Sequence, residues 1–109
     1  MTGNFTETIT VQCAEPVKLI ELIAQWDRDQ ATADIMGYMG TRVLADRDHH
    51  GRYLIIADFG VVDPNVSAAE EAARNNERPE TQAMGAAITE LLGGPAEYGN
   101  FDELYRTDH

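Results

Sequence analysis

The sequence predicts an α+β domain in which a four-stranded antiparallel sheet carries helices on one face. Short runs of the chain alternate polar and apolar residues with a period of two, which is typical of strands. Longer runs repeat apolar residues every three or four positions, which is typical of helices. The chain has 109 residues, of which 43% are hydrophobic and 25% are charged, so we expect residues 1–109 to fold as a single domain.

The first half of the chain predicts a strand, a helix and a hairpin. Residues 6–13 alternate and are rich in Thr, Ile and Val, which favours a half-buried strand. Pro16 suits the first turn of a helix, and an amphipathic pattern then runs from residue 17 to about residue 32. Residues 38–46 and 52–62 read as two strands separated by a turn rich in Asp, His and Gly. We expect these two strands to pair as an antiparallel hairpin.

The second half predicts a broken helical region and a last strand. The segment Ser67-Ala-Ala-Glu70 matches a capping box, which marks the start of a helix that runs to about Asn75. Pro79 breaks this helix and begins another, which ends near Leu92 at a Gly-Gly-Pro stop. Residues 97–106 form the closing strand. The resulting order, β-α-β-β-α-β, is the ferredoxin-like arrangement.

The third predicted strand is apolar on both faces. One face carries Tyr53, Ile55, Ala57 and Phe59, and the other carries Leu54 and Ile56. With a turn centred between His49 and His50, the expected pairs are Leu44 with Ile55, Val43 with Ile56 and Ala45 with Leu54. Because the helices can cover only one face, we expect a homodimer in which two sheets pack against each other.

Composition narrows the possible partners and the compartment. Nineteen acidic residues against eight basic ones give a net charge of -11, which disfavours nucleic acid and anionic membrane surfaces. Cys13 is the only cysteine and ends an alternating run, so we expect it to be a buried core residue. The sequence shows no secretion signal and no stretch of transmembrane length, so we expect a cytoplasmic location.

The sequence resembles the antibiotic biosynthesis monooxygenase domain family, the dimeric α+β barrels. The resemblance spans nearly the whole chain and rests on Thr8–Val11, Gly37–Leu44, Arg52–Phe59 and Asn75–Gln82. It implies a ligand cavity between sheet and helices in each protomer, and two sheets packed face to face between protomers. Some relatives oxidise quinols or polyketide aromatics without metal or flavin, so the resemblance implies no cofactor.

A haem-degrading branch of that family uses an Asn, a Trp on the third strand and a His in the second helical region. In this sequence the second helical region has no histidine, and the third strand carries Phe59 where the branch has Trp. Haem degradation is therefore disfavoured. His49 and His50 fall in the predicted turn without Cys, Glu or His at ligand spacing, so we expect no metal site.

Two acids are candidate catalytic residues. Asp27 falls inside the apolar arc of the first helix, where its carboxylate is a candidate base toward a phenolic proton. The alternative is that Asp27 pairs with an arginine or lies in a frayed helix end. Asp58 interrupts the strand face that carries Leu54 and Ile56, so it either orients a ligand or accepts hydrogen bonds at the dimer interface.

Three aromatic residues and an arginine are candidate ligand-binding residues. Trp26, Tyr38 and Tyr53 are expected to line a cavity for an aromatic molecule, or else to belong to the plain core. Arg42, expected opposite Ala57, either reaches a substrate carboxylate or carbonyl or pairs with an acid on its own face.

Two functions remain open on the sequence alone. The first is a cofactor-independent monooxygenase that acts on a small aromatic or quinol-type molecule. The second is a non-catalytic module that binds a small ligand or a partner on the same dimeric scaffold, because no motif for catalysis is complete.

Overall fold

The computed structural model describes residues 3–32 and 37–108 of the chain. Its elements follow the predicted order, with the second helical region divided in two. They are β1 (Phe5–Gln12), α1 (Pro16–Thr32), β2 (Tyr38–Ala45), β3 (Arg52–Phe59), α2 (Ala68–Asn76), α3 (Pro79–Leu91) and β4 (Glu97–Asp102). The predicted α+β, ferredoxin-like class is confirmed.

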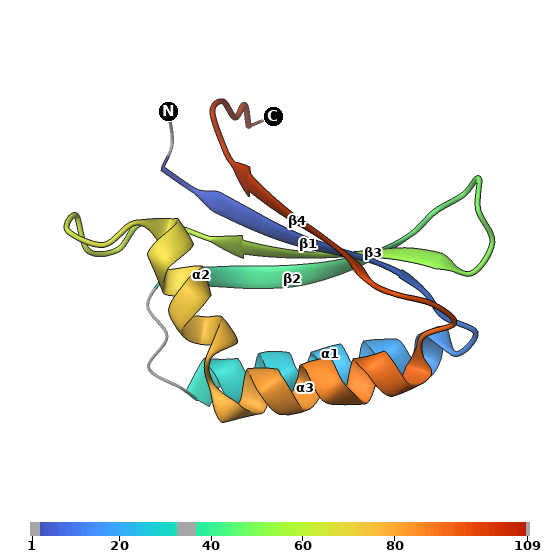
Figure 1. Ribbon diagram of the computed structural model, residues 1–109. Helices are drawn as coiled ribbons and strands as arrows, with labels where there is room; N and C mark the ends of the chain where they lie inside the picture. Colours follow the sequence, from blue (N-terminus) through green and yellow to red (C-terminus); the bar gives the residue numbers. More distant parts are fainter. Residues whose placement is uncertain (1–2, 33–36, 109) are drawn as a thin grey trace.

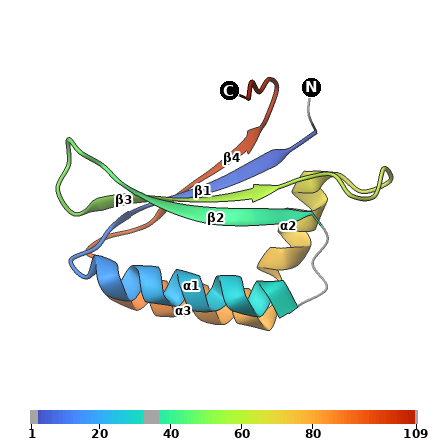
Figure 2. The same cartoon turned by 180° about the vertical axis from the view of Figure 1, so that it is seen from behind.

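The molecule has two layers. The strands form one antiparallel sheet in the order β2-β3-β1-β4. Helices α1 and α3 lie side by side across one face of this sheet, and α2 stands at one end between the sheet and the helix layer (Figure 1). The reverse view shows that the described helices leave the opposite face of the sheet uncovered (Figure 2). We call the helix-covered side the inner face and the other side the outer face.

The two helices of the second helical region begin as the sequence predicts. At the start of α2, the Ser67 hydroxyl accepts a hydrogen bond of 3.1 Å from the backbone N–H of Glu70, which satisfies a free donor. Helix α3 begins at Pro79, because proline has no backbone N–H to satisfy in a first helical turn. The predicted break between the two helices is therefore confirmed.

Two strands are shorter than the alternation predicts, because a strand ends where its neighbours end. β3 stops at Phe59, which is the last residue paired with both β1 and β2. β4 stops at Asp102, opposite Phe5 at the start of β1, and one further hydrogen bond joins the Glu103 N–H to the Asn4 carbonyl. The apolar residues beyond Phe59 therefore lie outside the sheet.

The hairpin register expected from the sequence is wrong by one residue. The observed pairs are Leu44 with Leu54, Val43 with Ile55 and Ala45 with Tyr53. The connection is a five-residue loop, 47–51, closed by a hydrogen bond of 3.0 Å from the Asp46 N–H to the Arg52 carbonyl. Gly51 completes this loop at φ +82°, a conformation that glycine adopts freely. A shift of one residue moves every side chain of a strand to the other face, so the pairing had to be read from the structure.

The core lies between the inner face and the helices in two adjoining groups. The larger group packs α1 and α3 on β1 and β3, and its buried members are Val11, Cys13, Leu19, Ile23, Ile55 and Ile88. The smaller group joins α2 to the end of the sheet through Phe5, Phe59, Ala68 and Ala72. Cys13 is buried in the larger group, as predicted.

The outer face is apolar along the hairpin and polar along β1. Leu44 and Phe101 are 41% and 57% exposed on it, and the cross-strand pairs place them on the same side as Leu54 and Ile56. β1 contributes threonines to this face. No helix within residues 3–32 and 37–108 combines the length and the apolar character needed to span a membrane.

Candidate functional site

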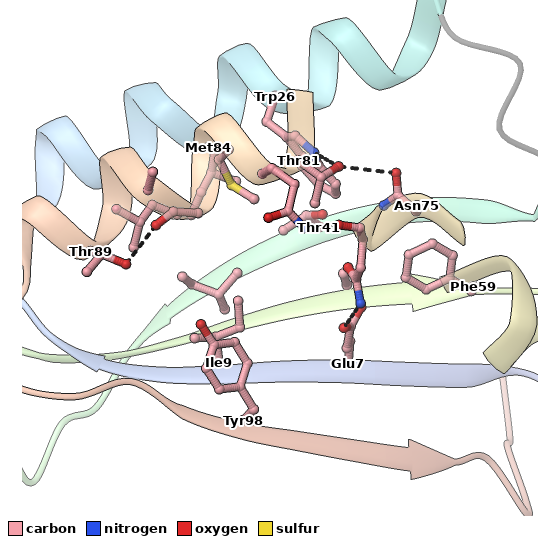
Figure 3. Close-up of a pocket in the computed structure, with 18 residues that line it drawn as sticks. Glu7, Ile9, Trp26, Thr41, Phe59, Asn75, Thr81, Met84, Thr89 and Tyr98 are labelled. Carbon is pink, nitrogen blue, oxygen red and sulfur yellow. Dashed lines mark hydrogen bonds between the residues drawn. The ribbon is translucent and has the colours of Figure 1, made fainter. Parts of the chain in front are cut away.

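A cavity of about 490 Å³ lies between the inner face and the helices (Figure 3). β1 and β3, together with Thr41 of β2 and Tyr98 of β4, form its floor, and α1, α3 and the end of α2 form its walls. Much of its lining is apolar and comes from Ile9, Ile23, Ile55, Phe59, Met84 and Ile88. A volume of this size is in the range of cavities that hold small organic molecules.

Glu7 supplies a carboxylate to this cavity. It lies on β1 between the inward-facing residues Phe5 and Ile9, so the pleat directs it to the inner face. Its Oε1 accepts a hydrogen bond of 2.7 Å from the side-chain amide of Asn76 at the end of α2. This partner holds the carboxylate in place, because a partly buried charge needs a hydrogen-bond donor.

Sequence reasoning missed Glu7 as a site residue. A charged residue in an alternating strand reads as a solvent-side residue. Glu7, Ile9 and Val11 occupy every second position of β1, however, so Glu7 lies on the buried side of the strand. This spacing of two residues from Ile9 is the signal that identifies Glu7 from the sequence.

Trp26 lines the cavity from α1 and joins a short hydrogen-bond network. Its indole N–H donates to the Thr81 hydroxyl at 3.0 Å, and that hydroxyl donates to the Asn75 side-chain oxygen at 3.4 Å. Asn75 is 2% exposed. The network therefore links α1, α3 and α2 at the cavity wall, as Figure 3 shows, and fixes the orientation of the indole ring.

Tyr38 and Asp27 lie behind the cavity wall and meet there. The Tyr38 hydroxyl donates to Asp27 Oδ1 at 2.7 Å, and its oxygen lies 2.6 Å from the Thr41 hydroxyl oxygen. Thr41 lines the cavity, whereas neither Tyr38 nor Asp27 is among its lining residues. The Tyr38 ring contacts Trp26 edge-on at 5.3 Å and lies 5.6 Å from Phe59. Burial raises the pKa of Tyr38.

The other sequence-predicted residues lie away from the cavity. Asp58 is on the outer face, where it accepts a hydrogen bond of 2.7 Å from the Thr6 hydroxyl. Arg42 is exposed on the same face opposite Ile56, which corrects the expected pairing with Ala57. The reason is the one-residue shift of register in the hairpin. Tyr53 faces inward but packs against the larger core group.

Residues 3–32 and 37–108 contain no group of three or more His, Cys, Asp or Glu side chains that could hold a metal ion. His49 is exposed in the loop between β2 and β3, and its Nδ1 lies 3.2 Å from Asp46 Oδ2.

Solved structures match the fold over nearly the whole chain. A protein from Nitrosomonas europaea that bears the name antibiotic biosynthesis monooxygenase has a TM-score of 0.76 at 12% identity, with 99% of this chain and 97% of that chain covered. SnoaB from Streptomyces nogalater, described as a cofactor-independent oxygenase, has a TM-score of 0.74 at 18% identity, with 98% and 99% covered. The fold is that of the antibiotic biosynthesis monooxygenases.

Rv0793 from Mycobacterium tuberculosis shows the same fold, with a TM-score of 0.72 at 12% identity and 96% of this chain and 99% of that chain covered. No protein-family model and no curated protein sequence matches the chain. The likeness to antibiotic biosynthesis monooxygenases is thus one of backbone arrangement, and the side chains of the cavity are this chain's own.

Proposed function

We propose that the chain is a cofactor-independent monooxygenase that acts on a small hydroxylated aromatic or quinol-type molecule held in the cavity. The observation that carries this proposal is Glu7, a carboxylate directed into a largely apolar cavity next to aromatic walls. The fold shared with SnoaB, a cofactor-independent oxygenase, supports the same reaction class.

The proposed chemistry begins with a proton transfer. Glu7 accepts the proton of a substrate hydroxyl, so that the substrate O–H bond breaks and a carboxylic acid forms on Glu7. The resulting anion is electron-rich and supplies electrons to dioxygen. One oxygen atom bonds to a ring carbon and the other leaves as water, so a quinol loses two hydrogens, gains one oxygen and becomes a hydroxyquinone.

The protein contributes position and a protected environment. Trp26 and the partly buried Ile9 and Met84 offer apolar surfaces against which an aromatic ring can pack. Asn76 holds the Glu7 carboxylate, which leaves the remaining oxygen lone pairs to meet a substrate hydroxyl. An apolar cavity also strengthens the interaction between that carboxylate and its ligand, because few waters screen it.

Oxygen uptake with a panel of hydroquinones and naphthohydroquinones tests the proposal. We expect protein-dependent uptake with at least one member and a product whose mass reflects one added oxygen and two lost hydrogens. With ¹⁸O₂, that product is expected to carry one labelled atom. Absence of protein-dependent uptake across the whole panel would contradict the proposed reaction.

The alternative function is binding without conversion, and one observation favours it. Several polar side chains of the cavity wall already bond to each other, Glu7 with Asn76 and Trp26 with Thr81. A cavity of this kind can hold a ligand with no further chemistry. This alternative predicts that a quinol raises the melting temperature and is recovered unchanged in air, whereas any protein-dependent product excludes it.

The proposed enzyme is a homodimer that buries the outer face. Leu44 and Phe101 are exposed there beside Leu54 and Ile56, and the described helices lie on the opposite side. Two such faces related by a two-fold axis would cover each other. Light scattering at micromolar concentration tests this arrangement, with a mass of about twice 12.0 kDa expected. A monomer mass over the whole concentration range would contradict it.

A further inference from the structure

The hydrogen-bond chain behind the cavity wall has a fixed direction. It runs from Thr41, which lines the cavity, to Tyr38 and then to Asp27 on α1. Tyr38 donates its single hydroxyl proton to Asp27 Oδ1 at 2.7 Å. The Thr41 hydroxyl must then donate to the Tyr38 oxygen. The one proton of Thr41 is used in that bond, so toward the cavity its oxygen can only accept a hydrogen bond.

The surroundings of Tyr38 maintain this direction of the two hydrogen bonds. Burial is the largest cause that raises the pKa of Tyr38, and the neighbouring Asp27 carboxylate raises it further, so the hydroxyl keeps its proton at neutral pH. The ring is held between Trp26 and Phe59, at centroid distances of 5.3 Å and 5.6 Å. The ring contacts therefore keep the phenol oxygen between Asp27 and Thr41, and the hydrogen bond to Asp27 directs the hydroxyl proton away from Thr41.

Thr41 also lies in register with Glu7 across the floor of the cavity. Both residues pair with Ala57, Glu7 from β1 and Thr41 from β2, so all three side chains project from the inner face in one row. Adjacent strands lie about 5 Å apart, which separates the Glu7 and Thr41 backbones by roughly 10 Å. The small Ala57 side chain between them leaves room for a ring, and both ends of the row present hydrogen-bond acceptors.

We propose that Thr41 is a specificity-determining residue, held as an obligate acceptor by Tyr38 and Asp27, that selects ligands with a second hydroxyl opposite the one that meets Glu7. The proposal rests on the proposed function only in taking the cavity as the ligand site. It assigns Tyr38 and Asp27 as positioning residues, since they act on the ligand through Thr41. A dihydroxylated ring is expected to bind better than the same ring with ether oxygens, which cannot donate.

Calorimetric titration without oxygen tests the proposal independently of turnover. The probes are 1,4-dihydroxynaphthalene and 1,4-dimethoxynaphthalene. The wild-type protein is expected to bind the diol at least tenfold more tightly than the diether. Thr41→Val is expected to lower that ratio by about tenfold, the effect of one hydrogen bond of ordinary strength, and Thr41→Ser is expected to restore it.

Two variants outside the cavity give the sharper test. Tyr38→Phe and Asp27→Ala each free the Thr41 hydroxyl to donate toward the cavity, the first by removing its acceptor and the second by letting Tyr38 turn its proton. Both are expected to shift the ratio toward the diether by severalfold, although neither residue lines the cavity. Tyr53→Phe removes a hydroxyl from a tyrosine packed in the core, and it is expected to leave the ratio unchanged.

The outcomes separate this proposal from the proposed function. A preference for the diol that T41V abolishes, in a protein that consumes no oxygen, supports the role of Thr41 and contradicts the monooxygenase. Oxygen consumption together with an equal preference for the diol in wild type and T41V supports the monooxygenase and contradicts the role of Thr41. A wild-type protein that binds the diol no more tightly than the diether, or binds neither, overturns the role of Thr41. Circular dichroism of each variant confirms that it is folded.

Discussion

The same strands build both faces of the sheet, but the described helices cover only the inner face. On the inner face, Glu7 lies in a cavity under the helices and is held by the Asn76 amide. On the outer face, Asp58 lies on a surface that the described helices leave open and is held by the Thr6 hydroxyl. Glu7 and Asp58 occupy adjoining rungs of the β1–β3 ladder. Since neighbouring residues of a strand point to opposite sides, one ladder contributes both to the cavity and to the face where we propose that two protomers meet.

The largest expected effect distinguishes the two acids. Glu7→Gln keeps an oxygen that can accept from Asn76 but removes the proton acceptor, so we expect kcat for quinol oxidation to fall by about 10²- to 10⁴-fold. Asp58→Asn, on the outer face, is expected to change kcat by less than about twofold. Steady-state oxygen uptake measures both rates. Equal losses in the two variants would show that the inner carboxylate has no special role.

The next effect compares two phenylalanines. Phe59 on the inner face is 0% exposed, whereas Phe101 on the outer face is 57% exposed. Phe59→Ala is expected to lower the free energy of unfolding by about 3–5 kcal/mol, because it leaves a cavity in the core. Phe101→Ala is expected to cost less than about 1 kcal/mol in the monomer. Urea unfolding at two protein concentrations measures both, and a concentration-dependent loss in F101A would locate its effect at the dimer contact.

The next prediction tests the proposed dimer contact on the outer face by introducing a charged side chain there. Leu44→Asp places a carboxylate among apolar side chains that we propose to be buried between two protomers. We expect the mass from light scattering to fall to that of one chain, while circular dichroism remains that of the wild type. Val17→Asp is the matched control, since Val17 is an exposed apolar residue on α1, 67% exposed. A dimer that survives L44D but not V17D would place the contact on the helix layer instead.

Periodicity was sufficient to predict the order of the elements, because each helix and strand buries one face of its own. Proline and the capping serine marked the break between α2 and α3 for local reasons. The hairpin register depended on the loop at Gly51, whose positive φ no pattern of polarity encodes. A single residue of error there was enough to misplace Arg42, which lies on the outer face.

The cavity was less predictable than the fold, because it is assembled by contacts distant in sequence. Trp26 could be anticipated from its place on the apolar stripe of α1. Asn76 is 69 residues from Glu7, and no local pattern announces that the two side chains meet. Asp27 stood out as an acid on an apolar helix face, but its partner Tyr38 became evident only in the structure.

The smallest effect concerns the hydrogen bond that holds the outer acid. Thr6→Val removes the hydroxyl that donates to Asp58 at 2.7 Å while it keeps the shape of the side chain. We expect a loss of about 1 kcal/mol in the free energy of unfolding, since the bond is partly exposed to water. Thermal unfolding measures this loss, and it should amount to a few degrees for a chain of 109 residues. Thr8→Val is the control on the same face of β1, because its hydroxyl does not contact that acid. If T6V lowers the free energy of unfolding as much as F59A, the outer acid is structurally as important as the inner core. The contrast between the cavity side of the sheet and the proposed assembly side would then have no energetic basis.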